Sequence, residues 1–523
     1  MTKRLIALLL AVIMCCGAFA GCTNGGGGGG GGGGGTEDLE GATIQLVVVP
    51  IDGLDHQACY LTQAVQEKLN CTLNYLMLDE FGTVYAATQL SDGEAPDITY
   101  FSGYSATYEQ YGMDGAYINI LDYLDQMPNV KAHLEANPTL LEAYTAEDGC
   151  LYTIPQKNIG GTAERVAYLY REDIFVENNL TWPKNQTEFE ATLRTLKEKY
   201  PDSYPFTMRN MNNNVQGAQS WGYLWGASHT SSGSHNTIFT LDENGEYFNG
   251  MVSDAYKEMG QYLQWLKGEG LLDPSTYTHT TETWYEALSS NRAFITYDKV
   301  DRLPYINMMG QTTQGKEFQM IAGAAFNMGS HAAKTSEVIT GYQGAGAAGF
   351  LYLGNNDNKT ATMKYVDWLF SDDGFVTCNW GIEGESYEVD ENGKKYFKES
   401  FLNEHGTLLP TGLNVNTTGG NWDMEAFYGI CDEKLIQSLE VSQSMGVGQR
   451  QYNLKYNRAE RRIWDKYYKA CNEYARAEWM KMVMGQRSWD TWDDLKNTLK
   501  TTYHEDDLKT IAYSALNRIL NGE

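Results

Sequence analysis

The chain has 523 residues, of which 67 are acidic and 39 are basic, so its formal net charge is −28. A surface this acidic argues against binding of nucleic acid and of polyanionic ligands in general. The length is too great for a single hydrophobic core and predicts at least two lobes. Aromatic side chains make up 12% of the chain, a surplus that bears on the choice of ligand below.

The first 41 residues indicate export and anchoring. Two basic residues precede an apolar run over 5–14, which is too short to remain as a membrane span. Small residues then lead into Cys22, a pattern that resembles a bacterial lipobox, and eleven consecutive glycines follow. Such a glycine run behaves as a random coil. We expect a lipoprotein signal peptide over 1–21 and, over 22–41, a lipidated Cys22 with a glycine-rich tether; a plain secretory signal is the alternative.

The body of the chain starts with a strand, a helix and a second strand. The first apolar strand covers 43–49, the helix carries Leu61, Val65 and Leu69 at four-residue spacing, and the second strand covers 72–78. This order predicts a parallel α/β sheet. No later run is apolar enough for a transmembrane helix, so we expect the body to lie outside the cell.

Two amphipathic helices and two hairpins are expected further along. Thr187 is the expected N-cap of the first helix, which continues through Leu196. The second helix places its apolar residues on one face: Tyr256, Met259, Leu263 and Leu266. Asn-Gly pairs in 242–246 and 390–393 predict hairpin turns, because neither segment has the alternating oxygens and terminal glutamate of a calcium loop.

The most informative segment lies near residue 380. Residues 365–374 are followed by GIEGESY over 381–387, where glycines flank an aromatic. This segment resembles the "iDyl.s.eG…yGieG..Y" block of extracellular solute-binding protein family 1, the large carbohydrate-binding proteins of bacterial ABC importers. Trp380 and Tyr387 are expected to be structural, since the block recurs across binders of different sugars. Other blocks match in the same order: 92–98, 148–155, 168–173, 182–189, 268–274 and 485–516.

The resemblance implies an α/β, two-lobe, periplasmic-binding-protein-like fold (type II-like) with the ligand cleft between the lobes. The N-terminal lobe is expected to take residues 42–154 and 346–415. The C-terminal lobe would take 155–345 and a helical completion over 416–523. Ligands outside the carboxyl ends of strands and at domain interfaces are also what this architecture favours on physical grounds.

The resemblance further implies a receptor with no catalysis. It would capture an oligosaccharide and deliver it to the permease subunits of an ABC importer, as a monomer held by its lipid anchor on the outer face of the cell membrane. No cofactor, metal ion or nucleic-acid partner is expected. Two alternatives remain: a secreted glycan-degrading enzyme, since 67 acidic residues leave chance carboxylate pairs, and a sugar-sensing subunit of a membrane signalling system.

A sugar ring is bound by flat aromatics on its apolar faces and by polar side chains on its hydroxyl rim. Positions that match the family, mainly its maltose-binding branch, supply most candidates: Asp52, Phe101, Tyr104, Gln156, Asn158, Tyr297 and Asp298. Tyr104 stands where that branch has an acid, and Tyr297 is expected to stack on the sugar. Loops rich in glycine and asparagine, a composition typical of exposed platforms, add Trp221, Trp225 and Trp422.

Three features suggest a cofactor or a metal ion at first sight, but the residues around each of them favour another interpretation. Residues 344–349 satisfy GxGxxG, but a strand over 350–353 follows in place of the helix that a dinucleotide site needs. Some alginate-binding relatives carry a calcium loop just after the helix that begins near residue 187; here 197–205 stands at that place with too few carboxylates. The six cysteines beyond Cys22 show no metal spacing and are expected as small buried hydrophobes, although they could pair.

Overall fold

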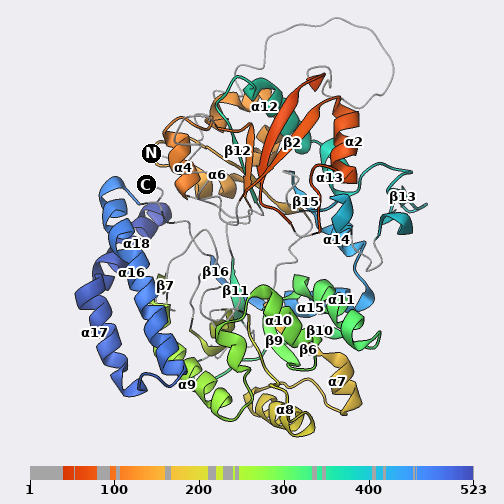
Figure 1. Cartoon of the computed structure of the whole chain (residues 1–523). Coiled ribbons are helices and arrows are strands. Elements are labelled where there is room, and N and C mark those ends of the chain that lie inside the picture. The colour runs from red at the N-terminus through yellow and green to blue at the C-terminus, as the bar shows by residue number, and fades with distance from the viewer. Residues whose placement is uncertain are drawn as a thin grey trace, which may run out of the picture.

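Two separate hydrophobic cores organise the chain in the computed structural model (Figure 1). The first core takes residues from 39 to 154 and from 350 to 413, together with Ala426. The second core takes residues from 167 to 328 and from 424 to 516. The chain therefore passes between the two lobes more than once.

The structure describes residues 39–51, 53–78, 95–101, 106–159, 166–209, 220–227, 239–241, 247–331, 339–343, 349–402, 408–415, 420–450, 454 and 456–521. Cys22, with the expected signal peptide and tether, lies outside these ranges, and so do the ligand candidates Asp52 and Tyr104. Within the described part of the chain, none of the helices combines the length and the apolar character that crossing a bilayer requires.

The first core is built on a five-stranded sheet in the order β2-β1-β3-β12-β4. β1 pairs in parallel with β2 and with β3, which confirms the parallel start predicted from the strand–helix–strand pattern. β12 returns from the second core and runs antiparallel to β3 and β4. The strands are β1 (Thr43–Val48), β2 (Thr72–Met77), β3 (Ile98–Phe101), β4 (Ile154–Gln156) and β12 (Gly349–Leu353).

Helices pack around the first sheet. The predicted spacing is confirmed in the helix between the first two strands, where Leu61, Val65 and Leu69 are buried. The Asp367 carboxylate accepts the backbone N–H groups of Asn129 at 2.8 Å and Val130 at 3.0 Å, which satisfies the free donors at a helix start. The helices are α2 (Tyr60–Leu69), α4 (Ala106–Met113), η3 (Ile120–Gln126), α5 (Pro128–Ala136), α6 (Pro138–Tyr144), α12 (Lys359–Leu369) and α13 (Asp372–Asn379).

The second core is built on a three-stranded antiparallel sheet in the order β10-β6-β9. Asn185, and not Thr187 as predicted, caps the helix α8: its side-chain oxygen accepts the backbone N–H of Glu188 at 2.9 Å. The elements are β6 (Val166–Arg171), β9 (Ile295–Lys299), β10 (Met320–Gly323), α7 (Glu172–Glu177), α8 (Gln186–Lys199), α9 (Asp254–Gly268), α10 (Thr281–Ser289), α11 (Leu303–Gln314) and α15 (Glu433–Gln443).

Three C-terminal helices extend the second core: α16 (Arg458–Val483), α17 (Trp492–Tyr503) and α18 (Glu505–Asn521). The buried Trp479 of α16 donates its indole N–H to the backbone oxygen of Tyr256 in α9 at 3.1 Å. Arg518 of α18 donates to the Glu460 carboxylate near the start of α16 at 2.9 Å. These contacts fix the helical layer along one side of the second lobe, as the blue ribbons of Figure 1 show.

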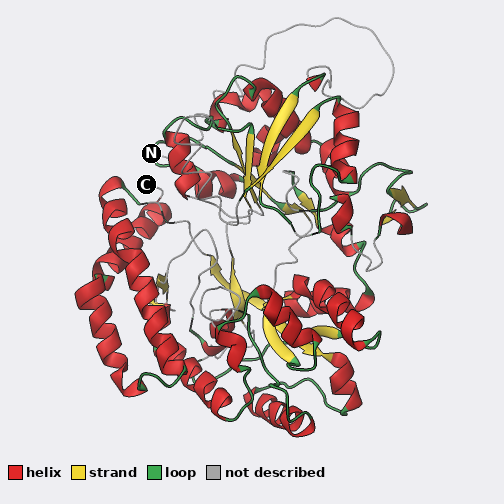
Figure 2. Ribbon diagram, in the orientation of Figure 1, coloured by secondary structure: helices red, strands yellow, loops and turns green. Residues whose placement is uncertain are grey.

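Short strand pairs and turns complete the fold (Figure 2). Antiparallel strand pairs flank both predicted hairpin turns, β7 (Phe239–Leu241) with β8 (Tyr247–Asn249) and β13 (Tyr387–Val389) with β14 (Lys395–Phe397). The first turn itself, 242–246, lies outside the described residues. Two parallel pairs join distant segments, β5 (Asn158–Ile159) with β15 (Trp422–Asp423) and β11 (Ile339–Gln343) with β16 (Gly446–Arg450). Short helices include η5 (Gly222–Trp225), η7 (Gly250–Val252), η8 (Pro274–Tyr277), η9 (Val300–Arg302), η10 (Glu399–Phe401), η11 (Leu409–Thr411), α14 (Met424–Tyr428) and η12 (Trp489–Thr491).

Candidate functional site

One edge of the first sheet is where the chain crosses between the two cores. β3 and β4 end at this edge and β12 begins there, since Phe350 pairs with Phe101 and Gly349 pairs with Gln156. The segment after β4 leads into the second core, and the segment before β12 returns from it. Ligands of α/β sheets bind outside the carboxyl ends of strands. This edge is therefore the first place to look for a binding site.

Phe101 ends β3 with part of the residue exposed. Its ring stands edge-on to the ring of Tyr108 in α4, with 4.4 Å between the centroids. The contact fixes the orientation of the Phe101 ring. A partly exposed ring of fixed orientation suits stacking against the apolar face of a flat ligand.

Gln156 ends β4 as a fully buried side chain. Its Nε2 donates to the backbone oxygen of Gly420 at 2.6 Å, which joins the first crossing segment to a later one. A Cβ atom added to Gly349 would lie 2.2 Å from the Gln156 Oε1, so β12 approaches this side chain through a position open only to glycine. Gln156 thus links backbone segments and reaches no surface from which to meet the ligand predicted for it.

Asn158 and Trp422 are brought together by the pairing of β5 with β15. The two residues are register partners, and the backbone N–H of Trp422 donates to the oxygen of Lys157 at 2.9 Å. Both residues are partly exposed. The Trp422 indole N–H donates to the backbone oxygen of Asn414 at 2.8 Å, and its ring lies 5.3 Å from that of Phe427. The structure thus places a flat aromatic beside an amide on the crossing strands.

The segment around residue 380 holds this crossing in position. Asn379 accepts the backbone N–H of Asp423 and donates to the backbone oxygen of Asn421, both at 3.0 Å. Asn414 donates to the backbone oxygen of Asp423 at 2.9 Å. Trp380 is buried and donates its indole N–H to the Asp423 carboxylate at 2.8 Å, which confirms its expected structural role. The sequence did not single out these asparagines, because isolated amides have no periodic pattern.

Trp221 and Trp225 do not form the exposed platforms predicted for them. Both are buried in the second core. Trp221 donates its indole N–H to the Tyr168 hydroxyl at 2.8 Å, and its ring lies 5.3 Å from the ring of Trp225. Gly226 has a φ of 75°, a conformation that suits glycine, in the turn just after Trp225. This glycine therefore belongs to a turn beside the buried core and not to an exposed platform.

Tyr297 and Asp298 lie in β9 and are buried as well. Tyr297 pairs with Tyr168 across the sheet, their rings are 5.1 Å apart, and burial raises the pKa of Tyr297 well above its ordinary value. Asp298 accepts hydrogen bonds from Arg209 at 2.9 and 3.0 Å and from the backbone N–H of Lys299 at 2.7 Å. Tyr297 is predicted to stack on the sugar, yet its ring is buried in the structure, because the residues of β9 up to Asp298 are buried whichever face they point to.

The partly exposed candidates that remain are Phe101, Asn158 and Trp422. They supply ring faces and an amide that both donates and accepts, which are the groups that recognise a polyol. None of the three side chains titrates near neutral pH, so they can bind and orient a ligand but not transfer a proton. In the described ranges, no cluster of three or more His, Cys, Asp or Glu side chains is arranged for a metal ion. The six described cysteines are free thiols, and four of them are buried.

Comparison with known sequences identifies a curated relative of the chain. No protein-family model matches the chain. The chain is similar to the fructooligosaccharide ABC transporter substrate-binding protein FusA of Streptococcus pneumoniae serotype 4, with 23% identity over 321 residues. The match covers 58% of this chain and 56% of FusA, so the chain spans about half the length of this curated relative.

Comparison with solved structures extends over most of the chain. The alginate-binding protein AlgQ2 without calcium ion matches with a TM-score of 0.72 and 21% identity, over 92% of this chain and 98% of that one. An EF-hand mutant of S. pneumoniae FusA in complex with fructo-nystose matches with a TM-score of 0.69 and 17% identity, over 92% of this chain and 100% of that one. The chain therefore has the two-lobe, periplasmic-binding-protein-like fold of solute-binding proteins. These comparisons confirm the fold that the resemblance to extracellular solute-binding protein family 1 implies.

Proposed function

We propose that this protein is an extracellular receptor that captures an oligosaccharide and delivers it to an ABC importer without catalysing a reaction. The observation that carries the proposal is the pairing of Asn158 with Trp422 on strands that cross between two α/β lobes. The relatives support it, since FusA is a fructooligosaccharide ABC transporter substrate-binding protein and AlgQ2 is an alginate-binding protein.

Binding at the crossing strands would couple capture to a hinge motion. Met424 packs in the second core, whereas Ala426, two residues later, packs in the first core. The short helix that follows Trp422 is thus in contact with both lobes. A ligand that touches both lobes makes its full set of contacts in the closed state, and it therefore shifts the population toward closure.

The proposed ligand is a neutral oligosaccharide. A net charge of −28 disfavours a polyanion unless the local charge of the site opposes it. Phe101 and Trp422 would stack on sugar faces, and Asn158 would bind hydroxyl groups. Asp52 and Tyr104, which lie outside the described residues, are proposed as further contacts in the segments after β1 and β3.

The main test is calorimetric titration of the purified protein with fructo-oligosaccharides, other neutral glycans and alginate oligosaccharides. We expect saturable binding of one class of neutral oligosaccharide and recovery of that sugar intact. Small-angle scattering should show that the protein becomes more compact when the sugar is added. Shortened products would contradict the receptor and favour the glycan-degrading enzyme. Growth on the bound sugar that persists after deletion of the partner permease genes would instead favour a sensing subunit.

We further propose that the protein is a monomer tethered to the outer face of the cell membrane through a lipid on Cys22. The small residues before Cys22 and the glycine run after it support this anchor. Cys22→Ala should release the protein from membranes and leave its thermal unfolding unchanged. Mass spectrometry of the mature N-terminus checks the lipid, and an unacylated N-terminus at another residue would contradict the anchor.

A further inference from the structure

The loop that follows α8 raises the question of a bound cation. Two structural neighbours are AlgQ2 without calcium ion and an EF-hand mutant of FusA, and some alginate-binding relatives carry a calcium loop just after the helix that begins near residue 187. Calcium takes six to eight oxygen ligands, with several carboxylates among them. Here residues 197–205 contain two carboxylates, those of Glu198 and Asp202, and both residues are exposed. The side chains of this loop therefore do not fit a calcium ion.

Lys197 places its ammonium group against the backbone of this loop. The Lys197 Nζ donates to the backbone oxygens of Pro201 and Ser203, both at 2.7 Å. It also lies 4.9 Å from the centre of the Tyr204 ring, within the range of a cation–π contact. An ammonium group has three donors and no acceptor. Two carbonyl oxygens and an aromatic face thus surround it, and carbonyl oxygens are also ligands that calcium accepts.

The loop is closed tightly around this ammonium group. The backbone N–H and the hydroxyl of Ser203 both donate to the backbone oxygen of Tyr200, at 2.9 and 2.7 Å. The backbone N–H of Tyr204 donates to the oxygen of Arg292 at 2.7 Å. The carbonyls of Pro201 and Ser203 are therefore turned toward one point, where Lys197 meets them.

The loop leads into a segment that lies beside β9. The backbone N–H of Phe206 donates to Leu271, and that of Thr207 donates to Ile295, both at 3.0 Å. The backbone N–H of Asp273 donates to the oxygen of Phe206 at 2.8 Å. The geometry of the loop thus sets where this segment joins the core of the second lobe.

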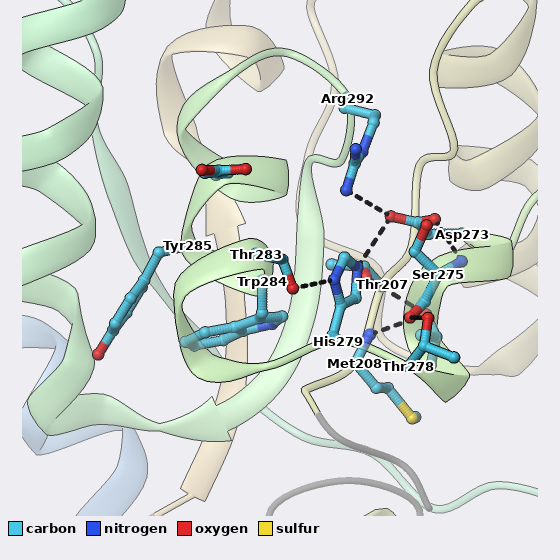
Figure 3. Close-up of polar contacts among 12 residues, drawn as sticks. Thr207, Met208, Asp273, Ser275, Thr278, His279, Thr283, Trp284, Tyr285 and Arg292 are labelled. Carbon is cyan, nitrogen blue, oxygen red and sulfur yellow. Dashed lines mark hydrogen bonds and ion pairs between the residues drawn. The ribbon is translucent and has the colours of Figure 1, made fainter.

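A buried polar cluster anchors the far side of the same segment (Figure 3). The Asp273 carboxylate contacts His279 Nε2 at 3.1 Å and the Arg292 guanidinium at 3.5 Å. His279 Nδ1 contacts the Thr283 hydroxyl at 3.0 Å. Arg292 therefore contributes its backbone oxygen to the loop and its guanidinium group to the cluster. The loop and the cluster are one connected support for the second lobe.

We propose that the Lys197 ammonium is the resident cation of this loop and takes the role of a bound divalent ion, so that the second lobe keeps its structure without calcium. The proposal does not depend on which sugar the protein binds. It follows from the two hydrogen bonds of Lys197 to backbone carbonyls, from its contact with the ring of Tyr204, and from the fact that residues 197–205 contain only two carboxylates, both exposed.

The first test uses the unmodified full chain. We expect the same thermal midpoint in EDTA, in millimolar calcium and in millimolar magnesium. Hydrogen–deuterium exchange across residues 200–207 should also be the same in EDTA and in calcium. Slower exchange across this segment in calcium, without the same change in magnesium, would overturn the proposal because it would mean that the loop itself binds calcium.

The second test replaces the cation and keeps the methylene chain. Lys197→Met should lower the thermal midpoint by about 3–6 °C, because it removes two charge-assisted hydrogen bonds. It should also speed exchange across residues 200–207 and leave exchange in α16 unchanged. Lys199→Met is the matched control, since Lys199 is exposed on the same helix and has no polar contact in the described part of the chain. Equal behaviour of the two variants would overturn the proposal, and the EDTA comparison stands even if Lys197→Met fails to fold.

Discussion

Two segments of the molecule present aromatic side chains near the end of a strand or beside a sheet, and they differ in what covers them. At the crossing strands, Trp422 belongs to a two-stranded pair between the lobes and stays partly exposed. In the second lobe, Trp221 and Tyr297 lie against Tyr168 of the three-stranded sheet and are buried. Glycine-rich composition does not decide exposure, since Trp221 and Trp422 both lie in such segments. The ring that stays partly exposed is the one whose strand leaves the core.

Hydrogen bonding alone does not distinguish the two segments. The Trp422 indole donates to the backbone oxygen of Asn414, and the Trp221 indole donates to the Tyr168 hydroxyl, both at 2.8 Å. Each indole N–H is satisfied, as polar groups in folded proteins generally are. The layers that pack on the ring therefore decide its exposure. Mutations should therefore distinguish the two segments: replacing an aromatic residue in the second lobe should lower stability, and replacing Trp422 at the crossing strands should lower sugar affinity.

The largest expected effect is loss of stability in the second lobe. Trp221→Ala should lower the free energy of unfolding by about 3–5 kcal/mol, because it leaves a large cavity in a packed core. Urea denaturation measures this loss. Calorimetry on the folded fraction should give an unchanged sugar affinity, since the ring reaches no surface. If Trp221→Ala unfolded at the same urea concentration as the wild type but bound the sugar more weakly, Trp221 would be a ligand contact and not a core residue.

An effect of similar size is expected from the buried ion pair. Arg209→Met should cost about 3–5 kcal/mol, because it leaves the Asp298 carboxylate buried without its partner. Replacing both residues with apolar ones, Arg209→Met with Asp298→Leu, should recover part of the loss. Denaturation of the single and double variants checks this. If Asp298→Leu alone abolished sugar binding while stability was unchanged, Asp298 would be a ligand residue after all.

A smaller effect, on affinity, is expected at the crossing strands. Trp422→Ala should weaken binding of the sugar by about 1–3 kcal/mol, comparable to the loss of an interface anchor. It should also reduce the compaction seen by small-angle scattering when ligand is added. Trp489→Ala is the control, because Trp489 is another partly buried tryptophan, in the turn before α17. Equal affinities of the two variants would exclude Trp422 from the site.

Much of the fold could be predicted from local patterns. Leu61, Val65 and Leu69 repeat at helical spacing because one face of α2 is buried, and such periodicity is visible in a single sequence. The Asn-Gly hairpin before β14 was predictable because its turn needs particular residues. The N-cap of α8 was misplaced by two residues, since Asn185 and Thr187 are both good caps and only the contact with Glu188 decides between them.

The candidate site was less predictable, for physical reasons. β9 is buried on both of its faces, so the alternation of apolar and polar residues from Ile295 to Asp298 does not reveal an exposed face toward which Tyr297 could point. Arg209 belongs to no motif, yet its guanidinium group donates hydrogen bonds to the Asp298 carboxylate and so takes up the groups that were predicted to meet the ligand. The pairing of Asn158 with Trp422 joins segments far apart in the chain, and a single sequence has no signal for such a contact.

The smallest expected effect appears only in acid and concerns the polar cluster of the second lobe. Burial opposes ionisation of Asp273, but hydrogen bonds from His279 and the Ser275 backbone outweigh it and hold the pKa of Asp273 below its ordinary value of 3.8. A carboxyl whose pKa is lowered by folding stabilises the protein above the unfolded-state pKa, and the contribution is lost as pH falls through the folded-state pKa. The stability advantage of the wild type over Asp273→Asn should therefore be constant near neutral pH and shrink below about pH 4. Asp202→Asn, in the exposed loop after α8, should show no such change. An advantage that persisted undiminished at the lowest pH would mean that the charge of Asp273 does not stabilise this lobe.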